Sequence, residues 1–398
     1  MSFASISAGG LDVQTLSYGF ELEFIIHGYD QDENATSDQE DLRRSEVAAL
    51  LTTVLPNVRH QASGLEPTLS EPVNKLVPLK YHYWNVDTDH TVRPAPDTKT
   101  EGPVVCEVSS AVLYSGPQNR MTEQQRDTVY DVCRAIRNNH PTRVNDTCGL
   151  HVHIGECGET IAVETVRRLL LLVWAAEPVL IMLLPAYRHD CIYLLPLSQT
   201  SALACRPEGS KEGEGAKWAE FANGPWPQAI GRLVAGAQDQ ILPEHAKAFK
   251  LIGHLSLDEL AMVALCPGFR MSLSLHGTSK ASRSAKYSPP GTVESRYMPG
   301  TLEPEIICDT VDLWLGMYHA ARHWDESKFA SVFSGLYDRA WVEKAEKGAL
   351  AELLLGLDLM EQFPQWAAYC LDGKRGARST SSARCPGGEA SRPKRRRR

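Results

Sequence analysis

The sequence predicts an α+β fold, in which helices pack on the apolar face of an antiparallel sheet and an active-site cleft lies on the other face. Five strand-like runs alternate polar and apolar residues, and segments with helical spacing of apolar residues lie between several of them. The polar positions of these runs are mostly carboxylates, imidazoles and arginines. Solvated faces of antiparallel sheets usually carry lysine, threonine and glutamine, so this polar face predicts a binding site.

The first strand-like run, residues 18–24, places Glu21 and Glu23 between large apolar side chains. Because successive side chains of a strand point to opposite faces, both carboxylates share one face about 6 to 7 Å apart. At an effective dielectric constant near 20, two such charges repel by roughly 2 to 3 kcal/mol. A divalent cation, a proton or an arginine is therefore expected beside them.

Four later runs repeat this pattern. Their polar positions are Glu107 with Ser109, His151 with His153, Arg270 with Ser272 and Ser274, and Glu294 with Arg296. Any single pair also fits an ordinary sheet with one solvated face. Together, however, these are the residue types that bind divalent metals and phosphates.

Helices are expected where apolar residues recur with helical spacing. These segments are residues 37–55, 122–138, 163–184 with an interruption near Pro178, 257–265, 310–322, and parts of 325–371. Residues 81–92 predict a hairpin around Asp87 to Asp89, and residues 57–80 look irregular. The polar stretch 198–240 predicts an insertion or a mobile lid rather than core.

The composition favours a globular protein. With 398 residues, 43% of them hydrophobic, the chain has enough material for a large core. It has no run of eighteen apolar residues and no signal-like N-terminus, which predicts an intracellular protein, cytoplasmic or nuclear, without membrane association. The ten cysteines are scattered without CxxC pairs, so free thiols are expected.

The C-terminal segment differs from the rest of the chain. From Lys374 onward there are ten basic residues and one acid, which leaves 31 basic against 48 acidic residues, a net of −17, in residues 1–373. The segment predicts a disordered basic tail that acts as a nuclear-import signal, an RNA-binding patch or a solvated charge run. The acidic body argues against nucleic acid as the main ligand. The expected organisation is a loose leader over 1–17, a catalytic domain over 18–372 and the tail over 373–398.

Four motifs, in this order, carry a family resemblance. They are Gly19 to Phe24, Glu107 to Ser110, Cys148 to Gly155, and Gly291 to Arg296 followed by Gly300 and Thr301. The chain thus resembles the amidoligase family, carboxylate–amine ligases related to glutamine synthetase and γ-glutamylcysteine synthetase, over about residues 18–322. The resemblance implies a glutamine-synthetase-like antiparallel sheet, ATP and Mg²⁺. It also implies amide or isopeptide formation through an acyl phosphate, from small-molecule or peptide carboxylate and amine substrates.

The residue types and the resemblance together assign candidate roles. Glu21, Glu23, Glu107 and His151 are expected to bind metal; His153, Arg270 and Arg296 to bind the nucleotide; Glu294 and Arg296 to act in catalysis; and Asp89 and Arg188 to contact substrate. Two positions depart from the family pattern. Ser295 stands where a bulky aromatic residue is usual, and His90-Thr91 follows Asp89 where Gly-Ser is commoner.

Two other functions remain open on the sequence alone. Cys148, His151 and His153 together have the ligand types of a zinc-dependent hydrolase. Cys148 near His151 is also a candidate nucleophile. The other alternative to a ligase is a catalytically inactive nuclear interaction module that is delivered by the basic tail.

Overall fold

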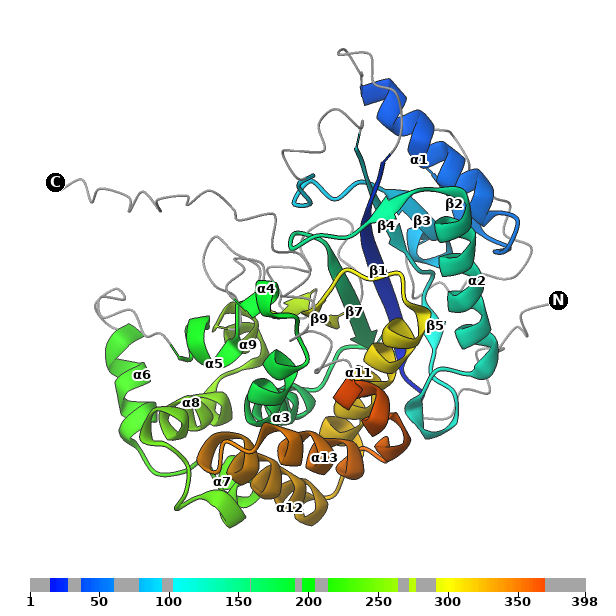
Figure 1. The fold of residues 1–398 in the computed structure, drawn as a ribbon. Coiled ribbons are helices and arrows are strands. Elements are labelled where there is room, and N and C mark those ends of the chain that lie inside the picture. The colour runs from blue at the N-terminus through cyan, green and yellow to red at the C-terminus, as the bar shows by residue number, and fades with distance from the viewer. Residues whose placement is uncertain are drawn as a thin grey trace, which may run out of the picture.

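The computed structural model describes residues 15–27, 37–60, 79–94, 103–157, 159–189, 195–204, 214–263, 272–276 and 291–368. Its architecture is α+β, as predicted, with one mixed, mostly antiparallel open sheet and many helices (Figure 1). Most of the predicted leader, the candidate Arg270 and the predicted basic tail lie outside the described residues. No helix in the described part of the chain is both long and apolar enough to cross a membrane.

The sheet brings the predicted strands side by side. Its strands are β1 Ser17–Ile26, β2 Val58–Arg59, β3 Trp84–Asp87, β4 Val104–Ser109, β5 Leu113–Tyr114, β6 Thr142–Arg143, β7 Gly149–Gly155, β8 Leu273–His276 and β9 Thr292–Pro299. They follow the order β2-β3-β4-β1-β7-β9-β8, and β5 and β6 also pair with β1. Only β2 and β3 pair in parallel among the described strands, so the sheet is mixed rather than purely antiparallel. The five strands predicted from polar alternation are consecutive in this order.

The described residues contain twelve α-helices and several short 3₁₀ and π turns besides the sheet. The helices are α1 Ser37–Leu51, α2 Glu123–Asn139, α3 Val163–Met182, α4 Ala186–His189, α5 Leu197–Thr200, α6 Glu214–Asn223, α7 Gln228–Leu233, α8 Pro243–His254, α9 Leu257–Val263, α11 Pro304–His323, α12 Glu326–Tyr337 and α13 Glu346–Gly356. Short 3₁₀ turns lie at Leu79–His82, Pro117–Asn119, Ala235–Ala237 and Met360–Gln362, and a π turn at Asp338–Val342.

The interruption predicted near Pro178 is wrong, because α3 continues through this residue. Proline lacks the N–H that would bind the carbonyl four residues earlier, here that of Trp174. The indole Nε1 of Trp341 donates to this carbonyl oxygen at 3.0 Å instead. A tertiary contact therefore supplies the hydrogen bond that the helix loses.

The predicted hairpin is also wrong, and the stretch 198–240, predicted as an insertion or lid, contains helices. Among the described residues 79–94, only β3 is a strand, so the predicted hairpin does not form, and β3 pairs with β2 and β4. The stretch 198–240 contains α6 and α7 in its described part, and Ile230 and Leu233 of α7 are buried. Leu203, Val234 and Ala237 of this stretch also belong to the main core, although its overall composition is polar.

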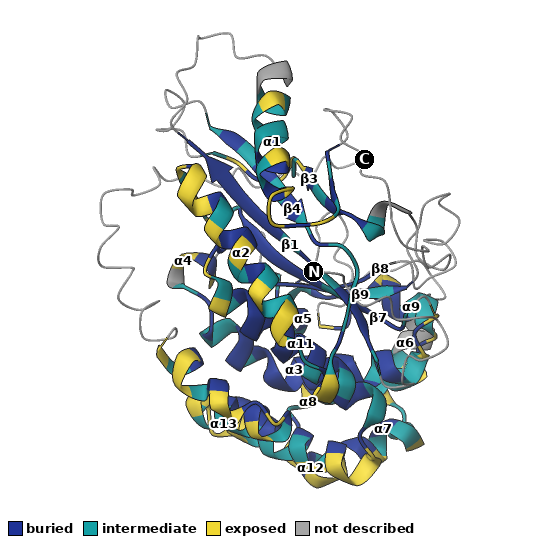
Figure 2. Ribbon diagram, turned by 90° about the vertical axis from the view of Figure 1, so that its right-hand side faces the viewer, coloured by how far each residue is buried: buried dark blue, intermediate teal, exposed yellow. Residues whose placement is uncertain are grey.

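Apolar packing covers one face of the sheet. Phe20, Leu22 and Phe24 of β1 are almost completely buried and belong to the same core as Val47 of α1 and Val129 of α2. Helices α1, α2 and α11 lie along the sheet, whose strands are largely coloured as buried in Figure 2. Because side chains alternate along β1, Glu21 and Glu23 are left on the opposite face, as predicted.

Helix α2 offers a test of fold stability away from the polar face. The Thr122 side chain caps the first turn by accepting from the backbone N–H of Gln125, whose side chain accepts from the N–H of Thr122. We predict that Thr122→Ala lowers the free energy of unfolding by about 1 kcal/mol. Urea denaturation measures this change. Thr128→Ala, at a half-buried position inside the same helix, is the control and should cost much less, because Thr128 does not cap the helix.

Candidate active site

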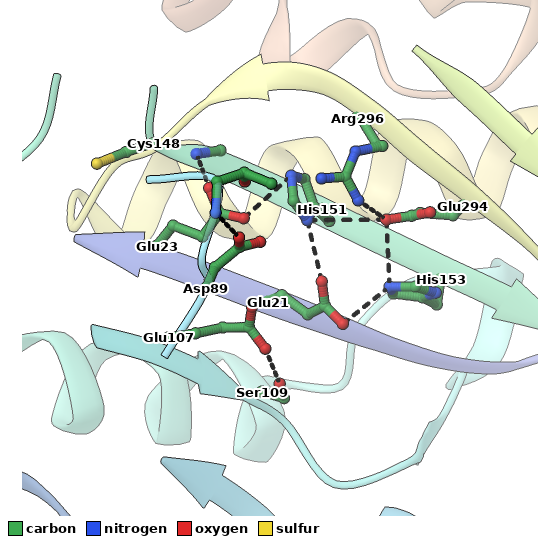
Figure 3. A network of polar contacts seen from close by, with 12 residues as sticks. Glu21, Glu23, Asp89, Glu107, Ser109, Cys148, His151, His153, Glu294 and Arg296 are labelled. Carbon is green, nitrogen blue, oxygen red and sulfur yellow. Dashed lines mark hydrogen bonds and ion pairs between the residues drawn. The ribbon is translucent and has the colours of Figure 1, made fainter. Parts of the chain in front are cut away.

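Residues from β1, β4, β7 and β9 meet on the polar face of the sheet (Figure 3). The register sets Glu21 opposite His151 of β7, and Glu23 opposite Glu107 of β4. On the far side of β7, His153 is opposite Glu294 of β9. Directly paired residues of neighbouring strands share a face, so the convergence follows from the pairing itself. The sequence motifs therefore meet in one place, as predicted.

One group on this face comprises Glu21, His153 and Glu294. Each residue offers a ligand atom, and these atoms lie within 4.8 Å of one another. The Nε2 atom of His153 is 3.2 Å from Glu21 Oε1 and 3.8 Å from Glu294 Oε1. Two carboxylates and one imidazole at this spacing form a set that suits a divalent cation.

A second group comprises Glu23, Asp89 and Glu107, whose ligand atoms also lie within 4.8 Å of one another. Asp89 follows β3 and accepts from the backbone N–H of Thr91, so the turn forms even with Thr at this position. Ser109 Oγ donates to Glu107 Oε1 at 3.0 Å. An all-carboxylate set of this kind is typical of Mg²⁺ sites.

Glu23 is held from one side only. Its Oε2 accepts from the Gly149 backbone N–H at 2.5 Å, whereas its buried Oε1 has no hydrogen-bond partner among the described residues. A buried carboxylate oxygen without a partner costs free energy unless a cation or proton meets it. This orphaned oxygen fits a bound cation at the second group.

His151 lies between the two groups. Its Nδ1 is 2.9 Å from Glu21 Oε2, and its Nε2 is 3.5 Å from Glu23 Oε1. It belongs to neither group of ligand atoms, so the geometry gives it the position of an orienting residue. The sequence assigned metal binding to His151 and nucleotide binding to His153, and these assignments remain predictions.

Arg296 of β9 brings a guanidinium to this face. It is largely buried and donates through Nη1 to Glu294 Oε1. Its backbone N–H donates to the Ser272 carbonyl at 2.7 Å, which fixes β9 beside the start of β8. Ser295, the predicted departure, is buried opposite Val152 and Leu273, on the apolar side, as expected.

In the second group, the pKa values of Glu23 and Glu107 are raised, whereas that of Asp89 is lowered. Burial, and then the nearby Asp89, raise the pKa of Glu23 to about 9. Burial, followed by the repulsion of Glu21, raises the pKa of Glu107 to about 8. Asp89 behaves oppositely: burial acts to raise its pKa, but hydrogen bonds from Thr91 and from Glu23 lower it. The hydrogen bond with Asp89 requires a proton on Glu23, and without that proton Glu23 Oε1 has no partner among the described residues.

The first group is an ion pair instead. Burial alone would raise the pKa of Glu21, but His153 and His151 together hold it well below its usual value. Burial acts to lower the pKa of His153, but Glu21 and Glu294 raise it to about 9. Burial lowers the pKa of His151, which is therefore neutral at physiological pH. A cation at this group would displace the His153 proton.

These pKa values predict how stability changes with pH. Glu23, Glu107 and His153 all have folded-state pKa values above their unfolded values. The folded state therefore binds more protons, so their contribution to stability is complete at low pH and is lost as the pH rises toward 9. We predict that the melting temperature of the metal-free protein falls between pH 6 and pH 9.

Mg²⁺ should reverse this fall, because it replaces the protons that these groups lose. The Mg²⁺-induced rise in melting temperature is expected to grow from pH 6 to pH 9 and is measured by differential scanning fluorimetry. The double variant Glu23→Gln, Glu107→Gln is the control, since it removes two of the titrating groups. An Mg²⁺ effect that shrinks with rising pH would contradict the assignment.

Two residues that the sequence suggested as functional, Cys148 and Arg188, belong to neither group of candidate ligands. Burial raises the pKa of the Cys148 thiol to about 12, and its Sγ contacts Asn145 Oδ1 at 3.5 Å. Such a thiol is a poor nucleophile, and its sulfur joins neither group of candidate ligand atoms. Arg188, expected to face substrate, is almost fully buried and donates to backbone carbonyls of the loop before β7.

Gly149 is a site residue whose role the sequence analysis missed. Its N–H holds Glu23, and a Cβ at this position would lie 2.3 Å from His151 Nε2. Any larger residue would displace the imidazole. The available signal was a glycine two residues before His151, at the start of a strand, where glycine usually marks a close approach.

A comparison with known proteins matches part of the chain to a family. Residues 14–203 match the model of the family described as "Putative amidoligase enzyme". The resemblance predicted from the motifs is thereby confirmed over this segment, which contains β1 to β7 and α1 to α5. Glu294 and Arg296 lie beyond the matched residues, so their place in the site rests on the sheet register. A search of curated proteins gave no match.

Proposed function

Taking the family match over residues 14–203 as the premise, we propose that the protein is an ATP-dependent ligase that joins a carboxylate to an amine. Family membership of this segment points to amide-bond ligation. The finer parts of the proposal are a glutamine-synthetase-like use of the sheet face, ATP and Mg²⁺ as cofactors, and an acyl-phosphate intermediate.

One observation carries the proposal. Two groups of ligand atoms lie on one sheet face, and four neighbouring strands and the turn after β3 supply them. Five carboxylates, those of Glu21, Glu23, Asp89, Glu107 and Glu294, face one arginine and one cationic histidine there. A triphosphate cannot approach this face unless cations come with it.

The residues present suit Mg²⁺. Glu23, Asp89 and Glu107 would hold one ion, and Glu21, His153 and Glu294 a second. When bound, Mg²⁺ would neutralise the triphosphate and the charge that develops during phosphoryl transfer. His151 would keep Glu21 in position through its Nδ1 contact, and the Gly149 N–H would do the same for Glu23.

The proposed reaction has two steps. A carboxylate oxygen of the first substrate attacks the γ-phosphorus of ATP, which forms an acyl phosphate and releases ADP. The amine then attacks the acyl carbon, phosphate leaves, and the amine nitrogen loses a proton. In this proposal, Arg296 would meet the transferred phosphoryl group with its planar guanidinium, after exchanging part of its pairing with Glu294.

The direct test is an ADP-release screen with Mg-ATP, in which amino acids, polyamines and peptides are offered in pairs as carboxylate and amine. A productive pair should release ADP and phosphate in equal amounts and yield a product lighter than the two substrates by one water. Hydroxylamine in place of the amine should trap the acyl phosphate as a hydroxamate. ADP release without either product would refute ligation.

Thermal stabilisation by Mg-ATP and metal analysis distinguish the ligase from the hydrolase and from the inactive module. The purified protein should gain stability from Mg-ATP in proportion to the logarithm of ligand excess. Tightly bound stoichiometric zinc with hydrolysis of amides would instead favour the hydrolase that was inferred from His151 and His153. No response to millimolar Mg-ATP would favour the inactive interaction module.

A further inference from the structure

We infer that Arg188 is a positioning residue that acts on the second group of ligands through the backbone of the loop before β7. The inference rests on the proposed function, because it concerns how the Glu23, Asp89 and Glu107 group is held ready for a cation. It changes the role that the sequence suggested for Arg188.

The contacts of Arg188 are with backbone atoms. Its side chain is buried, at 1% exposure, in the short helix α4 that follows α3. Nη1 donates to the carbonyl of Asp146 at 2.5 Å and to that of Cys148 at 3.2 Å. Both of these bonds come from Nη1, whereas the buried Nε has no hydrogen-bond partner among the described residues. The printed contacts of the guanidinium are thus with the loop backbone.

The same loop carries the atom that fixes Glu23. Cys148 accepts from Arg188 and also from the Gly300 N–H at 2.8 Å, so its carbonyl is held from two sides. The same peptide group presents the Gly149 N–H to Glu23 Oε2. Because a peptide unit is planar, fixing the Cys148 carbonyl also fixes the direction of the Gly149 N–H.

Close packing leaves this link little freedom. A Cβ on Gly300 would lie 2.6 Å from the Cys148 Cβ and 2.7 Å from the Glu23 carbonyl oxygen, so three segments meet here at backbone distance. Arg188 closes this junction from the side of α4. Its loss would free the loop at residues 146–148 and let Glu23 turn away from Asp89 and Glu107.

The test compares Arg188→Met with Arg168→Met in the full chain. Arg168 is a matched control, because it is also buried and donates to a backbone carbonyl, that of Trp324, at 2.6 Å. Its guanidinium stacks 4.6 Å from the Phe329 ring, among the helices. Both variants should lose thermal stability. Only Arg188→Met removes a contact that supports the second group of ligands.

Two readouts distinguish positioning from general destabilisation. The first is the Mg²⁺ concentration that gives half of the maximal thermal shift, which Arg188→Met should raise at least about tenfold, as loss of an outer-shell partner does. The second is hydrogen exchange of the Gly149 amide without metal, which should speed up at least about tenfold. Arg168→Met should leave both within about twofold of the wild type.

Arg188→Lys provides the conservative variant, since one ammonium can keep one of the two carbonyl contacts. It should fall between wild type and Arg188→Met in both readouts. Unchanged amide exchange in folded Arg188→Lys and Arg188→Met would overturn the inference. If the wild type shows no Mg²⁺ shift but the Arg188 variants lose amide protection, the positioning role stands and the proposed function fails.

Discussion

Glu23→Gln is expected to raise the Mg²⁺ concentration needed for half-maximal stabilisation by at least about 100-fold, because it removes a ligand and not merely an outer-shell partner. Ligase activity should fall below detection. Stability without metal should change by less than about 1 kcal/mol, since the pKa of Glu23 is raised to about 9 and glutamine resembles the protonated acid. The glutamine oxygen can still accept from the Gly149 N–H.

Glu177→Gln is the control for this prediction. Glu177 is fully buried, its pKa is raised by burial, and it accepts from the Leu197 and Ser198 N–H groups at the start of α5. Its replacement should reduce stability and leave the Mg²⁺ response unchanged. Titrating both variants by differential scanning fluorimetry gives the comparison. A wild-type Mg²⁺ response in Glu23→Gln would show that this carboxylate is not a ligand.

Arg296→Lys is expected to lower kcat by about 10³-fold and to change the stabilisation by Mg²⁺ alone by less than about threefold. An arginine that stabilises a transferring phosphoryl group contributes about 10³ to 10⁵ in kcat, and the lysine ammonium lacks its planar fork. The lysine would still neutralise Glu294. Steady-state rates of ADP release with the substrates found in the screen measure the effect.

Arg322→Lys serves as the matched control. Arg322 pairs with Glu156 Oε2 at 3.4 Å and lies in α11, away from the groups of candidate ligands. Its replacement should leave kcat within about twofold of the wild type. If Arg296→Lys retained near-normal kcat, Arg296 would have only a structural role in pairing with Glu294.

The strands of the site could be predicted because their side-chain period is short and local. Alternation placed Glu21 and Glu23 on the face opposite the core, and β1 then aligned Glu23 with Glu107 and Glu21 with His151. Sequence distance does not matter once strands pair. The family match over residues 14–203 agrees with the motifs that lie inside it.

Other features depend on contacts that no local pattern contains. The continuation of α3 through Pro178 needs an indole from residue 341, and the burial of Arg188 needs the carbonyls of Asp146 and Cys148. Asp89 joins Glu23 and Glu107 through a turn rather than a strand, so alternation could not place it. For the same reason, the sequence showed two imidazoles but not which of them joins a group of candidate ligand atoms.

The most direct measurement is an anomalous difference map from crystals grown with Mn²⁺ and a non-hydrolysable ATP analogue. Mn²⁺ can replace Mg²⁺ at oxygen-rich sites and scatters anomalously. We predict one peak among Glu23, Asp89 and Glu107 and another among Glu21, His153 and Glu294, with the triphosphate between them and Arg296. A nucleotide bound elsewhere, with no Mn²⁺ peak at either group, would contradict the account.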